Sequence, residues 1–168
     1  MTRSRKAKPP ERKTFLDLLI PNTLIFCEDY IVSNTNKVSY LKTIEILRAE
    51  ALPLVPERFV LAASLFRNPS ADINTFSSLN PEIKVVLRNP SDAMFELGVF
   101  PVSFLDPLKP WAIERLIIEF AKGDLQFNSS GGYTFQLLGR IEDQEFTPIF
   151  MSLLPVAKKG SKKKSAKV

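Results

Sequence analysis

The sequence predicts an all-β fold, an antiparallel two-sheet sandwich of the immunoglobulin-like, Greek-key type with disordered basic termini. Three observations support this prediction. Seven or so short stretches have the apolar pattern of strands. Thirteen prolines are present, many at the borders of these stretches, where regular structure ends. Long helical patterns are few, so two packed sheets are favoured over an α/β fold.

A hairpin is expected first. Residues 22–27 are a short apolar run rich in strand formers, and residues 38–44 place apolar side chains mostly at alternate positions. The polar link 33–37 between them favours a turn. Residues 45–52 have good helix formers at helical spacing, but Pro53 and Pro56 limit them to about two turns. We therefore predict an irregular connection here, with room for one helical turn.

The middle of the chain predicts two further strands and a bent third. Residues 58–67 form a strong apolar run, expected as the central strand of a sheet, and residues 70–81 are expected as a loop or irregular edge segment. Residues 82–88 alternate as a half-buried strand does, and residues 89–92 supply a turn. Residues 94–104 continue apolar, with Gly98 and Pro101 as bend or edge positions.

The last third predicts a strand and a terminal hairpin. Prolines exclude a regular element at 106–111, whereas residues 113–120 suit a strand or a helix, and the β-branched content together with Gly123 favours a strand. Residues 131–139 predict a strand that a tight link at 139–144 turns back into 145–154.

Charge divides the chain into three parts. Residues 1–13 carry six Lys or Arg and one Glu, and residues 157–168 carry six Lys and no acid. Residues 14–156, which we expect to be the single folded domain, then hold eleven basic and seventeen acidic residues, a net charge of −6. The net charge of +5 of the whole chain therefore belongs to two tails, and a basic groove on the domain is not expected.

Cysteine content and hydropathy predict a cytoplasmic protein. Cys27 is the only cysteine, so no intramolecular disulfide forms. The basic N-terminus is not followed by the apolar segment of a signal peptide, and no run of about 20 apolar residues could span a membrane.

The order of these elements resembles a family of bacterial β-sandwich domains of unknown function. The matching stretches are Phe26-Cys27-Glu28-Asp29, the strand 37–41, the link and strand 52–66, and the hairpin start 132–135. Together they cover roughly residues 22–154. Asn34 and Asn36 stand where the family has a glycine in its first hairpin, and the loop 70–81 is additional. The resemblance implies the fold and transfers no activity, because the family has no established mechanism.

Reactive constellations are not expected. The chain has no histidine, which removes every Ser-His-Asp or Cys-His arrangement and the commonest metal ligand. Cys27 lies in an apolar strand, and we interpret it as a buried small hydrophobe rather than a nucleophile. Glu28 and Asp29 should point to opposite faces of a strand, and the acidic residues of 142–145 fall in a turn. We predict no catalytic residue, cofactor or metal site, and hence no enzyme.

A tyrosine at the start of a predicted strand has two interpretations. Asn128-Ser129-Ser130-Gly131-Gly132 is interpreted as a turn, because no Lys-Ser or Lys-Thr pair follows it as in a phosphate-binding loop. Tyr133 after the two glycines fits the tyrosine corner of Greek-key sandwiches, whose hydroxyl bonds nearby backbone at a crossing between sheets. Plain core packing fits it equally well.

Two partner classes remain. The first hypothesis is a non-enzymatic binding or assembly module that contacts a protein partner or a second copy through residues 70–81 or 107–111, with Trp111 as an anchor if exposed. The alternative is non-specific contact of the basic tails with nucleic acid. The candidate electrostatic residues are Lys158, Lys159, Lys162, Lys163 and Lys164. A purely solubilising tail stays open as well.

Overall fold

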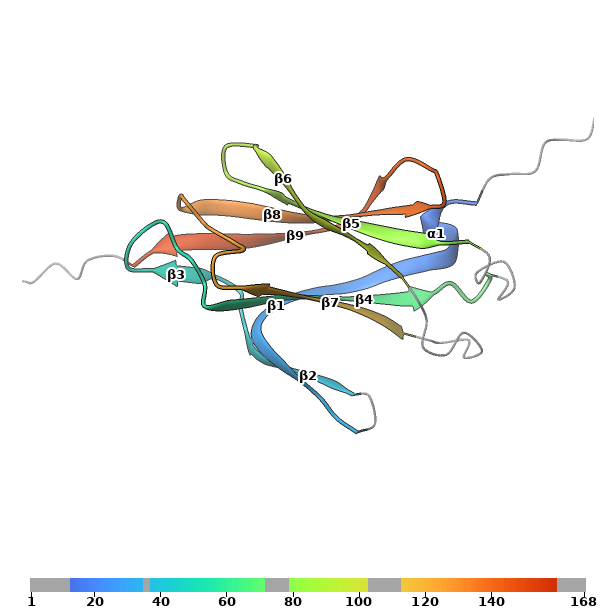
Figure 1. Ribbon diagram of the computed structural model, residues 1–168, viewed down its shortest axis with the longest axis horizontal. Coiled ribbons are helices and arrows are strands. Elements are labelled where there is room, and N and C mark those ends of the chain that lie inside the picture. Colours follow the sequence, from blue (N-terminus) through green and yellow to red (C-terminus); the bar gives the residue numbers. More distant parts are fainter. Residues whose placement is uncertain (1–12, 35–36, 72–78, 103–112, 160–168) are drawn as a thin grey trace, which may run out of the picture.

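A computed structural model describes residues 13–34, 37–71, 79–102 and 113–159 (Figure 1). Over these residues the chain forms one short helix and nine strands. They are α1 (Phe15–Leu18), β1 (Leu19–Val32), β2 (Val38–Thr43), β3 (Leu47–Ala49), β4 (Arg58–Arg67), β5 (Pro81–Arg88), β6 (Met94–Pro101), β7 (Ile113–Ala121), β8 (Gly131–Ile141) and β9 (Thr147–Lys158).

The strands form two packed sheets, which confirms the predicted all-β sandwich. Sheet A has the order β2-β1-β4-β7 and sheet B has the order β3-β9-β8-β5-β6. Figure 1 shows them as two layers, with sheet B above sheet A. Neighbouring strands are antiparallel except β3 and β9, which run parallel. The central position predicted for residues 58–67 is confirmed, because β4 lies between β1 and β7.

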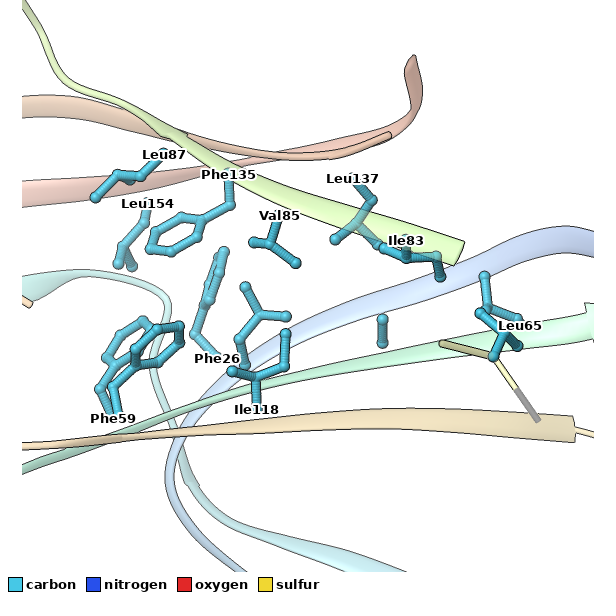
Figure 2. Packing of buried hydrophobic residues seen from close by; sticks show 14 of the residues in the cluster. Phe26, Phe59, Leu65, Ile83, Val85, Leu87, Ile118, Phe135, Leu137 and Leu154 are labelled. Carbon is cyan, nitrogen blue, oxygen red and sulfur yellow. The ribbon is translucent and has the colours of Figure 1, made fainter. Parts of the chain in front are cut away.

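The core is made by alternate side chains of the two facing layers. Side chains of β4 such as Phe59 and Leu65 point up from sheet A, and Phe135 and Val85 point down from sheet B (Figure 2). The ring of Phe135 lies 5.8 Å from that of Phe59 and 4.9 Å from that of Phe26, centroid to centroid. Burial of these rings, at about 25 cal/mol per Å² of apolar surface, supplies much of the driving force for folding.

The outer face of sheet A is partly covered by its own hairpin. The hairpin of β1 and β2 swings away from sheet B on the far side of sheet A (Figure 1). The Tyr30 hydroxyl reaches across β4 and donates a 2.7 Å hydrogen bond to Glu119 of β7. Cys27 and Val60 are register partners and fully buried, although both lie outside the core cluster between the sheets.

Two local elements differ from the sequence-based expectation. The helical turn allowed for residues 45–52 does not form; Leu47–Ala49 pairs instead with the end of β9, and Leu54 makes an isolated bridge with Phe127. The one helix of the described residues, α1, was not expected. It begins with a capping box between Thr14 and Asp17, a local signal present in the sequence. No helix in the described ranges is long and apolar enough to cross a membrane.

The crossing from β7 in sheet A to β8 in sheet B is closed by Tyr133. Its hydroxyl accepts a 3.1 Å hydrogen bond from the Ser129 N–H and lies 3.2 Å from the Ser129 carbonyl, to which it can donate. Its ring meets that of Phe127 edge-on, with 4.9 Å between the centroids. Both interpretations of Tyr133 therefore apply to one side chain, which fills the core and bonds the backbone at the crossing.

Candidate binding surfaces

Cys27 is placed where nucleophilic chemistry is unfavourable. It is free and 0% exposed. Burial raises the pKa of its thiol, so the neutral form dominates at physiological pH. The interpretation of Cys27 as a packed small hydrophobe agrees with this environment.

The predicted acidic pair Glu28 and Asp29 is divided between two cations. Glu28 lies 2.7 Å from the Lys42 ammonium, whereas Asp29 lies 2.6 Å from the Arg58 guanidinium. Arg58 also contacts Glu119 at 2.7 Å. The two carboxylates therefore do not converge on one ligand. Over the part of the chain that the structure describes, no group of three or more Cys, Asp or Glu is placed to hold a metal ion.

Two of the five candidate tail lysines lie within the part of the chain that the structure describes. Lys158 ends β9, and the Lys159 N–H donates a 2.7 Å hydrogen bond to the Ala49 carbonyl. The Lys159 ammonium lies 3.4 Å from Glu50. Lys162, Lys163 and Lys164 lie outside the described residues, as do Trp111, residues 107–110 and most of the predicted loop 70–81.

Exposed apolar side chains lie on the outer face of sheet B. Cross-strand register defines two rows on this face, which we call the methionine face. The first row is Met94, Arg88, Thr134 and Leu153, and the second is Glu96, Val86, Gln136 and Met151. Met94, Met151 and Leu153 are 62%, 64% and 61% exposed.

The charges on and beside the methionine face neutralise one another. Lys84 lies 2.9 Å from Glu96, and Arg140 donates a 2.6 Å hydrogen bond to Glu82. The cationic groups of Lys84 and Arg140 also lie 4.6 and 4.4 Å from the centroid of the Phe146 ring. Arg88 lies 3.8 Å from Asp92. The face consequently combines apolar contact area with no excess of either charge sign.

A cleft lies between the β5–β6 hairpin and the connection from β7 to β8. Its volume is about 300 Å³. The apolar lining is Leu87, Phe95, Leu97 and Leu125, and the polar lining includes Asn89, Asp124, Gln126, Asn128 and the Tyr133 side chain. This mixture of an apolar wall and several polar groups is typical of small-molecule sites.

A second, wider groove of about 510 Å³ lies beside β2 and β3. Apolar residues including Leu41, Ile44 and Leu54 line it. Most of the charged groups around it are already engaged, as in the pair Glu57 and Lys122 at 2.6 Å. It therefore offers fewer free polar groups than the smaller cleft.

Comparison with known proteins adds no family assignment. No family model matches the chain, and no curated protein matches it. The resemblance to bacterial β-sandwich domains stays a prediction.

Sequence reasoning did not identify the methionine face or the cleft. The alternation in residues 82–88 was visible, but which of its two faces looks outward depends on pairing with β8, which is distant in sequence. The cleft had a local signal, since polar and apolar residues alternate from Asp124 to Asn128.

Proposed function

We propose that the protein is a non-enzymatic binding module that docks another protein on the methionine face. The exposed Met94, Met151 and Leu153 support this proposal above all, because exposed large apolar side chains gathered on one face are typical of interaction sites. Methionine suits such a surface since its flexible thioether adapts to a partner.

The arrangement of charge supports a protein as the ligand. The ion pairs of Lys84 with Glu96, of Arg140 with Glu82 and of Arg88 with Asp92 leave the face electrically balanced. A nucleic acid would be favoured instead by an excess of Lys and Arg. A folded protein surface of ordinary composition meets the face without like-charge repulsion.

A matched pair of full-length variants tests the proposal. Met151→Glu/Leu153→Glu places two charges on the face, whereas Ile31→Glu places one on the β1–β2 hairpin at a site that is also more than half exposed. Thermal melting first verifies that both fold. A photo-crosslinker at Gln136 then captures neighbours in the producing cells, and sedimentation of the purified chain detects a second copy.

Crosslinked product or dimer is expected for the wild type and for Ile31→Glu. The double variant should lower it about tenfold, which corresponds to a loss of about 1.4 kcal/mol of binding free energy. Equal product from the double variant, or none from the wild type in either assay, contradicts the proposal.

A further inference from the structure

We propose that the 300 Å³ cleft between the β5–β6 hairpin and the β7–β8 connection binds a neutral sugar ring. Its volume lies at the lower end of the range for small-molecule sites and suits a single ring. The chemistry of its two walls, and the absence of cationic side chains among the described residues that line it, identify the class of ligand.

One wall presents hydrogen-bonding groups in a row. Residues 124–128 alternate, with Leu125 and Phe127 buried and Asp124, Gln126 and Asn128 exposed. Phe127 is held inward by its bridge to Leu54, where each backbone N–H donates to the other's carbonyl at 2.9 Å. The polar side chains at alternate positions therefore share the outward side, where they line the cleft.

These polar groups retain free donors and acceptors. Among the described residues, Gln126 and Asn128 make no side-chain hydrogen bond. Asn89 uses only its Oδ1, which accepts from the N–H groups of Ser91 and Ala93, so its amide nitrogen still has donors. Asp124 Oδ2 accepts from the Ala121 N–H at 2.7 Å, which leaves Oδ1 available. Primary amides and a carboxylate together match hydroxyl groups, which both donate and accept.

The other wall is apolar. Phe95 lies on β6 with 51% of its surface exposed, beside Leu87 and Leu97. A sugar ring has hydroxyl groups around its rim and C–H groups on its faces. The rim would meet the amides, and a C–H face would pack on the apolar wall.

The charge and the number of polar groups in the lining argue against other classes of ligand. Among the described residues that line the cleft, Asp124 is the one that carries a charge, so phosphates and carboxylates meet a like charge and no cation there. A metal ion needs more oxygen ligands than one carboxylate supplies. An organic ammonium would pair with Asp124 but leave the amides of Asn89, Gln126 and Asn128 unused.

The test is a titration of the full-length, ¹⁵N-labelled chain with glucose, galactose, mannose and N-acetylglucosamine. We expect saturable shifts of the backbone signals of residues 123–128 and 94–97 with at least one sugar. Short oligomers of the sugar that binds show whether a free ring or the end of a glycan is preferred.

Exposed substitutions separate the cleft from other surfaces. Gln126→Ala/Asn128→Ala should weaken binding at least about tenfold, while Gln136→Ala, a glutamine on the methionine face, should leave it unchanged. No saturable shift with any sugar, shifts located elsewhere, or equal binding by the double variant overturns the inference. Tighter binding of glucosamine or of glucose 6-phosphate than of glucose also overturns it, because either would show that charge selects the ligand.

Discussion

Tyr133 is the residue at which the crossing between the sheets can be tested. Tyr133→Phe keeps the ring against Phe127 but removes the hydroxyl that bonds the backbone of Ser129. Loss of a net hydrogen bond of this kind costs about 1 kcal/mol, and more if the Ser129 groups find no water. We expect the urea unfolding midpoint to fall accordingly with an unchanged denaturant slope.

Tyr40→Phe is the matched control for that measurement. The Tyr40 ring is half-buried, and its hydroxyl makes no hydrogen bond with the described residues. Its removal should leave the free energy of unfolding within about 0.5 kcal/mol of the wild type. Equal destabilisation by the two substitutions would mean that the Ser129 contact does not stabilise the crossing.

At the scale of elements, local patterns predicted some strands closely and missed others. The apolar run 58–67 predicted the bounds of β4 correctly, and the observed β8 is longer than the predicted strand 131–139 only by Arg140 and Ile141. β3 was missed because its three residues become a strand only by pairing with β9, more than a hundred residues later. β1 continues past Cys27 through Glu28 and Asp29, because each of these carboxylates forms an ion pair with a Lys or Arg side chain. The methionine face and the cleft depend equally on long-range pairing.

The attachment of the β1–β2 hairpin to β7 predicts a dependence of stability on pH. Hydrogen bonds from Tyr30 and then from Arg58 lower the pKa of Glu119 below its ordinary value of 4.5. A carboxyl with a lowered folded-state pKa stabilises the fold above its unfolded-state pKa, and this contribution is lost as the pH falls through the folded-state pKa. Because the Glu119 and Arg58 side chains remain in contact with solvent, which screens their charges, we expect a contribution of less than about 1 kcal/mol.

Urea unfolding of Glu119→Gln at about pH 7 and about pH 3 measures this contribution. The variant should be less stable than the wild type at the higher pH, and the difference should shrink at the lower pH. Glu45→Gln removes an exposed carboxyl that has no ion pair with the described residues, so its unfolding should match the wild type at both values. A difference between Glu119→Gln and the wild type that does not change with pH would show that the ionised carboxyl is not what fastens the hairpin.

At the scale of the whole molecule, an acidic domain carries basic ends. The residue at which the domain ends decides which deletion can test nucleic-acid binding by those ends. Residues 14–156 have a net charge of −6, so we expect nucleic-acid retention by this chain to come from its ends. Deleting everything after residue 156 would remove Lys158, the strand-register partner of Ala49, and the backbone hydrogen bond from Lys159 to Ala49. Loss of binding by that variant would be confounded with loss of structure.

Deletion of residues 160–168 avoids this difficulty, because it removes four lysines and leaves β9 complete. If the C-terminal lysines bind phosphates, retention on duplex DNA should fall. The negative slope of log K against log salt should become shallower, by up to about 0.9 for each phosphate that is no longer neutralised. Lys159→Ser is the control, since its ammonium already faces Glu50 and its removal should change the slope little. Equal slopes for the deletion variant and the full chain would assign any retention to the N-terminal residues or to the domain itself.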